Sequence, residues 1–272
     1  FFLMIRRPPR STQGVSSAAS DEYKRQFQGR LISIQNSVVL YECSDDIAVI
    51  TLNRPSHINA FSVQMRDELY EALSLLRDDP NAKIAILRGS GEQGFCAGAD
   101  LTEFGTAPSQ VIARSVRWER DLWGLFHTQP KPIVAALHGY VIGSGIEIAS
   151  LCDVRIAADN CVFRMPEVAL GMVPAAGGTQ TLPRLIGTSR TLEFILSNRV
   201  MKVEEARKIG LVDRIVITAE LLDECLSVSK LLTGYDESAL FLARRSVLLG
   251  LDLSLQAGLK LEKRLAETMS LR

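Results

Sequence analysis

The glycine-rich stretch at residues 131–182 constrains the fold of this chain more than any other feature. A short apolar segment at 132–137, with proline before it and glycine after it, predicts a buried β-strand. The glycines within 139–145 then permit a tight connection into a helix that we predict over 146–152. Because the first N–H groups of a helix are free and its dipole is positive there, this turn would stabilise an oxyanion.

Two glutamates lie in the same stretch, in otherwise apolar surroundings. Glu147 falls in the first turn of the predicted helix, where the dipole favours a negative charge unless burial overrides it. Glu167 has apolar neighbours, which raise the pKa of a carboxyl and suit it to donating a proton. We therefore take Glu147 as a candidate base and Glu167 as a candidate acid. The alternative is a helix-start charge at Glu147 and a solvated loop carboxylate at Glu167.

A second glycine-rich turn follows another predicted strand, at residues 83–87. Its sequence, GFCAGADLTEF, again places an apolar strand before a loop whose backbone can approach a ligand closely. Two such turns could each donate one backbone N–H to a single carbonyl oxygen, which is the geometry of an oxyanion hole. Neither turn has the glycine spacing of a dinucleotide fingerprint or the G-K-[ST] of a P-loop.

Five sequence blocks match the motifs of one known family: ITLNRP, NAF, FCAGADL, HGYVIGSGIEIASLCDVRIA and MPEVALGMVPAAGGTQTLPRLIG. On these blocks the chain resembles the enoyl-CoA hydratase/isomerase (crotonase) superfamily, most of all an enoyl-CoA hydratase, from residue 32 to the C-terminus. The resemblance implies an α/β fold, a crotonase-type β-β-α spiral with a C-terminal helical trimerisation region. It also implies an acyl-CoA thioester substrate and a homotrimer or dimer of trimers.

The same resemblance implies a hydro-lyase that adds water, reversibly and syn, to a trans-2-enoyl-CoA thioester, as in fatty acid β-oxidation. No cofactor or metal is expected, since CoA is part of the substrate. The oxyanion-hole amides would belong to Ala99 and Ser144, although hydratases most often have glycine at the second position. Glu147 would activate the water that adds at the β-carbon, and Glu167 would deliver the proton to the α-carbon. The positions implied for substrate and CoA binding are Ala60, Ala97, Gly98, Ala99, Asp100, Leu101, Gly143 and Pro166.

The sequence divides into three predicted regions. Residues 1–26 differ from the rest and resemble translated sequencing-adapter DNA; the alternative is a mitochondrial targeting segment, which the Pro8-Pro9 pair disfavours. Residues 27–216 form the predicted spiral core with the CoA and catalytic site, and residues 217–272 form the helical C-terminal region. Relative to the family, we expect the chain to be a fragment at both ends.

Hydrophobic periodicity predicts most of the remaining elements. Two strands at 38–41 and 47–52 form a predicted hairpin, and Ser62 is a good N-cap for a helix that Pro80 ends. A longer helix is predicted across 111–126. The further predicted elements are a strand at 153–157, helices at 179–185, 189–197 and 203–209, a strand at 212–216 and helices from 219 onward.

Composition and charge limit the classes of function. The net charge is zero and the isoelectric point is near 7.0, so no general attraction to nucleic acid or to an anionic membrane is indicated. No apolar run reaches the roughly 18 residues of a membrane span. Five cysteines without C-x-x-C spacing indicate a reducing compartment and no metal site; Cys96 is interpreted as a packed thiol and His57 as a surface residue. The predicted location is the bacterial cytoplasm, or alternatively the mitochondrial matrix.

Other functions stay open within the same resemblance. The chain could use its oxyanion hole for double-bond isomerisation, decarboxylation or ring-specific hydration, or it could be a catalytically silent CoA- or RNA-binding paralogue. The pair of glutamates favours a hydratase, and the neutral charge argues against RNA binding. Acyl-chain specificity would depend on a pocket wall for which Phe104, Trp118 and Met172 are candidates.

Overall fold

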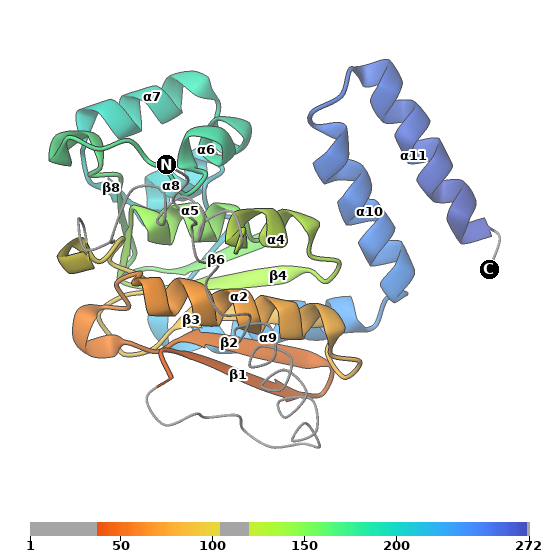
Figure 1. Cartoon of the computed structure of the whole chain (residues 1–272), viewed down its shortest axis with the longest axis horizontal. Helices are drawn as coiled ribbons and strands as arrows, with labels where there is room; N and C mark the ends of the chain where they lie inside the picture. The colour runs from red at the N-terminus through yellow and green to blue at the C-terminus, as the bar shows by residue number, and fades with distance from the viewer. Residues whose placement is uncertain (1–36, 104–119, 271–272) are drawn as a thin grey trace, which may run out of the picture. The chain divides into compact units, whose positions relative to one another are not determined.

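The computed structural model describes residues 37–103 and 120–270 (Figure 1). These residues all belong to one compact unit, within residues 33–272. The predicted N-terminal extension and the pocket-wall candidates Phe104 and Trp118 lie outside the described residues.

Six strands form the main sheet. They are β1 (Val39–Ser44), β2 (Ile47–Leu52), β3 (Ile84–Gly89), β4 (Ile133–Leu137), β6 (Val154–Ala158) and β9 (Arg214–Val216). The order is β1-β2-β3-β4-β6-β9, with β1 and β2 antiparallel and every other neighbouring pair parallel. The predicted hairpin is confirmed, and Asp45 (φ 52°) and Asp46 (φ 65°) take the left-handed conformation that its two-residue turn needs. Strand β4 is buried along its whole length, as parallel strands covered on both faces are.

A second sheet, of order β5-β7-β8, contains strands that the sequence pattern did not predict. β5 (Tyr140–Ile142) follows β4 within the glycine-rich stretch, so the predicted direct turn from strand to helix is wrong. β7 (Val162–Arg164) follows β6 in the same way, and β8 is Met201–Lys202. Strands this short carry no readable period of their own. The helices that follow are α5 (Ser144–Ser150) and α6 (Gly178–Ile186), so each unit runs strand, strand, helix, as the predicted spiral does.

Helix α2 (Val63–Asp78) begins where the sequence predicts it. The Ser62 side chain accepts a hydrogen bond from the Met65 N–H, at a distance of 3.1 Å. The apolar face of α2 is buried, and the helix contacts β1 and β2. Helix α9 (Leu221–Thr233) contacts β2, β3, β4 and β6, so both helices protect the strands of the main sheet from water.

One predicted helix differs from the structure. The periodicity predicts a continuous helix across 111–126, but the described chain is not helical immediately before Leu122. The Asp121 side chain accepts a hydrogen bond from the Gly124 N–H, at 3.0 Å, and caps α4 (Leu122–Thr128). Residues 111–119 of the predicted helix lie outside the described residues. Apolar spacing continues across this point, so the period alone could not reveal the break.

The later elements agree with the sequence prediction. The predicted helices correspond to α6, α7 (Thr188–Ser197) and α8 (Val203–Ile209), and the predicted strands to β6 and β9. Gly210 ends α8 with a φ of 90°, a left-handed conformation that glycine adopts at little cost.

The C-terminal part of the chain is helical, as predicted, and ends with α10 (Glu237–Gly250) and α11 (Leu255–Ser270). Arg244 fixes α10 to the core, because its guanidinium donates hydrogen bonds to the Asp153 carboxylate (2.7 Å) and to the Gln129 carbonyl oxygen (2.5 Å). Among the described residues, no helix combines the length with the apolar composition that crossing a membrane requires.

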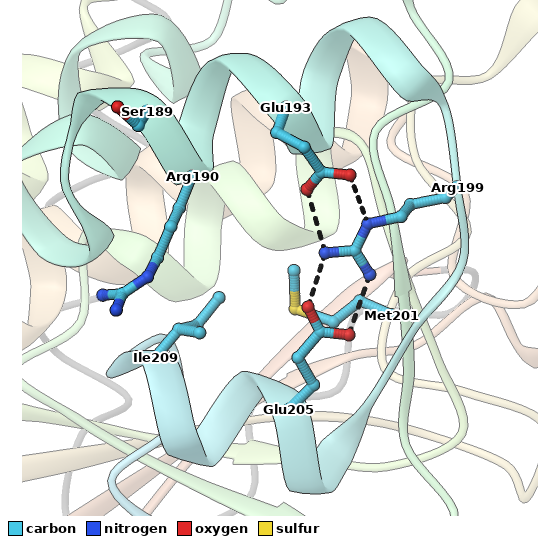
Figure 2. A pocket seen from close by; sticks show the side chains of 7 residues that line it. All are labelled: Ser189, Arg190, Glu193, Arg199, Met201, Glu205 and Ile209. Carbon is cyan, nitrogen blue, oxygen red and sulfur yellow. Dashed lines mark hydrogen bonds and ion pairs between the residues drawn. The ribbon is translucent and has the colours of Figure 1, made fainter.

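Helices α7 and α8 are joined by one arginine at a surface pocket (Figure 2). The Arg199 guanidinium donates hydrogen bonds to both carboxylate oxygens of Glu193, on α7, and of Glu205, on α8, at distances from 2.5 to 3.0 Å. This geometry favours the ionised carboxylates, so Arg199 lowers the pKa of both glutamates. The residues that line the pocket include none of the predicted catalytic or CoA-binding positions.

Removing this bridge tests its contribution to stability. Arg199→Ala should lower the Tm at neutral pH by about 1–3 °C, because a largely exposed ion-pair network contributes little and is screened by salt. Both glutamate pKa values are lowered in the folded state. The deficit should therefore be present above the ordinary glutamate pKa and vanish as the pH falls through the lowered values, which thermal unfolding at several pH values measures.

The matched control removes an arginine whose acidic partner lies in the same helix, so that no second helix is joined. Arg77→Ala deletes the contact with the adjacent Asp78 at the end of α2 and should change the Tm less. An equal loss of Tm in the two variants, or a loss that persists in acid, would contradict the bridging role of Arg199.

Candidate active site

The two glycine-rich turns lie side by side. Cys96 and Val141 form a β-bridge, and Ile142 donates its backbone N–H to the Cys96 carbonyl oxygen at 2.9 Å. The turn after β3 therefore runs along the connection that follows β4. A Cβ atom placed on Gly143 would lie only 3.7 Å from Gly98 Cα. The two segments expected to donate oxyanion-hole amides are thus neighbours in the fold.

Ser144 fits its position without backbone strain. The left-handed conformation falls on Gly143 (φ 49°), so Ser144 itself begins α5 as an ordinary helical residue. Ala99, the other expected donor, forms a parallel bridge with Phe61, which directs its own N–H away from Phe61. Within the described residues, no acceptor is bonded to the N–H of Ala99 or of Ser144. Both amides remain able to donate to a ligand.

Glu147 is buried, with 2% of its surface exposed, yet its carboxylate is hydrogen-bonded. Its Oε1 accepts from the Ala176 N–H (3.0 Å) and from the Gly178 N–H (2.9 Å) at the start of α6. Burial raises the pKa of Glu147, while these two amides oppose the rise because they favour the charged form. Glu147 does lie in the first turn of α5, as predicted, but burial dominates its pKa, so it is more than a solvated charge at a helix start.

Glu167 lies against the turn that precedes α5. Its Oε1 would be 2.5 Å from a Cβ atom placed on Gly143, so the carboxyl stands directly over that glycine. Its Oε2 is buried and, among the described residues, has no hydrogen-bond partner. Burial raises the pKa of Glu167, which favours the neutral acid. The side chain is half-buried, which contradicts its interpretation as a solvated loop carboxylate.

The two carboxyls are close enough to influence each other. The charge of Glu167 is among the causes that raise the pKa of Glu147. Glu147 receives two backbone amides, whereas Oε2 of Glu167 receives none among the described residues. Burial raises the pKa of both carboxyls, so their environments differ in hydrogen bonding and not in the direction of the pKa shift.

Sequence reasoning missed two residues that fix the candidate CoA loops. Arg54 Nη1 donates to Asp100 Oδ2 (2.5 Å) and to the Ala60 carbonyl oxygen (3.3 Å), so it joins the loop after β2 to the loop after β3. Hydrogen bonds from the Thr102 hydroxyl and from Arg54 lower the pKa of Asp100 to about 2. Asn59 is fully buried and bonds to both loops. Arg54 lies in the ITLNRP block and Asn59 in the NAF block, and this is the signal in the sequence that could have identified them.

The remaining predicted substrate- and CoA-binding positions differ in how far they are exposed to solvent. Those that are partly or fully exposed, where a ligand could reach the backbone, are Ala60, Ala97, Ala99, Leu101 and Pro166. Met172 is also partly exposed. Cys96 is fully buried and burial raises its pKa to about 12, which agrees with a packed thiol. His57 is exposed, as a surface histidine is.

Comparison with known proteins defines the class. The sequence model of the family described as Enoyl-CoA hydratase/isomerase matches residues 42–270. A crotonyl-CoA hydratase of Syntrophomonas wolfei subsp. wolfei is 32% identical over 224 residues, which cover 82% of this chain and 86% of that protein. The chain therefore belongs to the enoyl-CoA hydratase/isomerase family.

Solved structures agree with this assignment. The enoyl-CoA hydratase of Bacillus anthracis superposes with a TM-score of 0.80 at 32% identity, covering 85% of this chain and 90% of that chain. A Thermobifida fusca YX structure, solved in complex with CoA, has a TM-score of 0.79 at 27% identity and covers 86% of this chain and 93% of that chain. The described residues thus have the crotonase fold.

The position of Glu167 over Gly143 can be tested by adding one methyl group. Gly210→Ala should cost about 1–2 kcal/mol of unfolding free energy, because alanine at a left-handed position is strained while its Cβ meets only ordinary contacts. Gly143→Ala should cost more, because its ψ of −116° lies outside the left-handed helical region of Gly210 (ψ 10°) and because its Cβ would clash with Oε1 of Glu167. Urea unfolding measures both, and Gly143→Ala is repeated in a Glu167→Ala background, where the part of the loss that comes from the clash should vanish. A loss at Gly143 that is the same with and without the Glu167 side chain would mean that Glu167 does not occupy this place.

Proposed function

We propose that this protein is an enoyl-CoA hydratase, which adds water reversibly and syn to a trans-2-enoyl-CoA thioester. The observation that carries the proposal is the pair of differently solvated carboxyls, Glu147 and Glu167, beside the turn at Gly143. One carboxyl is held by amides and the other is half-buried, with one oxygen that has no partner among the described residues, which suits one base and one acid. The names of the hydratase relatives support the same reaction.

The oxyanion hole would consist of the Ala99 and Ser144 N–H groups. Addition of water at the β-carbon moves negative charge onto the thioester oxygen, and two preorganised amides stabilise that charge without reorganising. Gly98 and Gly143 make this arrangement possible, because their positive φ angles (93° and 49°) allow the two turns to approach each other. Loss of one such donor typically slows a reaction by about a hundredfold or more.

The two glutamates would divide the proton transfers. Glu147, as the carboxylate, takes a proton from the water that attacks the β-carbon. Glu167, as the carboxylic acid, gives its proton to the α-carbon, so one proton is taken and one delivered in each turnover. The amides of Ala176 and Gly178 oppose protonation of Glu147, and burial opposes ionisation of Glu167. Hydrogen bonds thus favour the charged base at Glu147 and burial favours the neutral acid at Glu167, while burial raises the pKa of Glu147 as well.

The CoA part of the substrate would lie along the loops that Arg54 joins. Ala60, Ala97 and Ala99 are partly exposed there, and Pro166 adjoins the acid Glu167. The N–H groups of Ala60 and Ala97 already donate to backbone carbonyl oxygens, whereas that of Ala99 has no acceptor among the described residues. The similar Thermobifida fusca structure with bound CoA supports an acyl-CoA ligand for this chain. No metal or redox cofactor takes part in the proposed reaction, since water and the thioester are its only reactants.

Replacing each carboxyl tests the reaction and the roles together. The parent protein should consume the enoyl-thioester absorbance of crotonyl-CoA, while Glu147→Gln and Glu167→Gln should each lower kcat by roughly 10²- to 10⁴-fold. Glu220→Gln, which changes an exposed glutamate, is the matched control and should leave kcat unchanged. A parent that binds CoA thioesters but does not hydrate crotonyl-CoA would overturn the proposal and favour another reaction of the family.

The pH profile gives a separate prediction. Because the acid limb reports the base and the pKa of Glu147 is raised, the acid limb of kcat/KM should lie above the ordinary glutamate pKa of about 4.3. In Glu167→Gln, the residual activity should keep an acid limb and lose the alkaline limb, because the carboxylic acid that must stay protonated has been removed. The two carboxyls influence each other, so the comparison between variants is the informative quantity. An alkaline limb that persists in Glu167→Gln would contradict the role of Glu167 as the acid.

The proposed assembly is a homotrimer or a dimer of trimers, formed through the C-terminal helices. Val247 (65% exposed) and Leu255 (81% exposed) place apolar side chains on α10 and at the start of α11. Sedimentation should give a trimer or hexamer for the parent and smaller species for the double variant Val247→Asp, Leu255→Asp. Val63→Asp, at an exposed apolar position on α2, is the control and should sediment like the parent. A monomeric parent would refute the assembly.

A further inference from the structure

A pair of hydroxyl side chains links α5 to α6 one helical turn beyond the catalytic contact. Ser150 follows Glu147 by three residues on α5, and Thr181 follows Gly178 by three residues on α6. Residues at this spacing share a helix face, so the Ser150–Thr181 contact repeats the Glu147–Gly178 contact farther along both helices.

The hydroxyl pair is short and largely shielded from water. Ser150 Oγ donates to Thr181 Oγ1 at 2.7 Å, and it also lies 2.7 Å from the Glu147 carbonyl oxygen. Thr181 Oγ1 in turn donates to the Gly177 carbonyl oxygen at 3.2 Å. Only 8% of Ser150 is exposed. With one proton on each hydroxyl, Ser150 donates to Thr181 while Thr181 donates to Gly177, so both groups are satisfied.

Among the described residues, no side chain caps the first turn of α6. Gly177 is the N-cap, with a φ of 101°. A glycine pair therefore carries the Gly178 amide that must reach Glu147 Oε1. Next to this turn, the Ser150–Thr181 contact is a side-chain hydrogen bond between α5 and α6, two helices that also pack against each other.

We propose that Ser150 and Thr181 are positioning residues: they hold the first turn of α6 in register with α5, so that the Ala176 and Gly178 amides stay on the Glu147 carboxylate. The catalytic consequence rests on the proposed function, in which Glu147 is the base. The geometric consequence, namely the occupancy of the two amide–carboxylate bonds, does not depend on it.

If this register is lost, the pKa of Glu147 should change in a definite direction. The amides oppose the effect of burial on Glu147, so weakening them leaves burial less opposed and raises the pKa of that carboxyl. In the described residues, the titratable groups that face Glu147 are Glu167 and the buried Cys96 thiol, whose raised pKa keeps it neutral. Neither group changes in a Thr181 or Ser150 variant. The acid limb of the activity profile should therefore move to higher pH.

The test compares threonines that are alike except for their partner. Thr181→Val removes the hydroxyl, Thr181→Ser retains it, and Ser150→Ala removes the other half of the pair. Thr191→Val is the matched control: Thr191 is 4% exposed on α7 and its Oγ1 bonds to the Gly187 carbonyl oxygen (2.9 Å), as Thr181 bonds to Gly177. Only the Thr181 hydroxyl also bonds to Ser150.

With crotonyl-CoA, Thr181→Val and Ser150→Ala should lower kcat by roughly threefold to tenfold, the effect of one lost hydrogen bond, with little change in KM. Their acid limb should lie at higher pH, and Thr181→Ser should return both quantities to parental values. Thr191→Val should leave the profile in place. An unmoved acid limb in Thr181→Val, or a shift of the same size in Thr191→Val, would overturn the proposal.

A second readout separates this proposal from the hydratase assignment. The titration of Glu147 can be followed by carboxyl ¹³C NMR of glutamate-labelled protein, with the signal assigned from Glu147→Gln. Its pKa should be higher in Thr181→Val and Ser150→Ala than in the parent, Thr181→Ser and Thr191→Val. That result would stand even in a protein that does not hydrate crotonyl-CoA, whereas equal pKa values in all variants would refute the positioning role.

Discussion

The hydrogen-bonded burial of the Glu147 carboxylate is the constraint on which the rest of the site depends. A charge with 2% exposure is costly unless donors replace its water, and the Ala176 and Gly178 amides, 29 and 31 residues farther along the chain, do so. The start of α6 must therefore come to α5. Gly178 has to lack a side chain, since a Cβ there would lie 2.9 Å from Glu147 Oε1. A structural requirement and the proposed catalytic role thus involve the same backbone amides.

The parallel main sheet supplies the platform for this arrangement. β3 and β4 are neighbours and run in the same direction, so the turns that leave them emerge at the same edge. In the small β5-β7-β8 sheet, β5 and β7 pair the segments that lead from β4 to α5 and from β6 to α6. Bonds between Cys96 and Ile142 and between Arg54 and Asp100 tie the loops together, so the candidate amide donors are carried on backbone that is held from two sides.

Prediction from the sequence succeeded where a local pattern has a local cause. The hairpin at Asp45-Asp46, the Ser62 cap and the stop at Gly210 follow from turn and cap chemistry that neighbouring residues determine. It failed where the cause lies elsewhere in the chain. β5 exists because it pairs with β7, which is distant in sequence, and the break before Leu122 depends on the Asp121 cap within a run of apolar spacing. Buried Asn59 and the Arg54–Asp100 pair were missed for the same reason, because polar partners cannot be read from periodicity.

The sequence by itself determined the family resemblance, the candidate carboxyls and the two glycine turns, because residue identity and spacing encode them. It left open whether Glu147 and Glu167 are solvated or buried, and whether serine at position 144 is strained. Only the tertiary structure decided these questions. Solvation and hydrogen-bond partners depend on which distant segments meet, and here the α6 amides reach Glu147, Gly143 takes the left-handed conformation ahead of Ser144, and Glu167 lies over that glycine. The pKa of a carboxyl is thus a property of the folded neighbourhood, whereas the presence of the carboxyl is a property of the sequence.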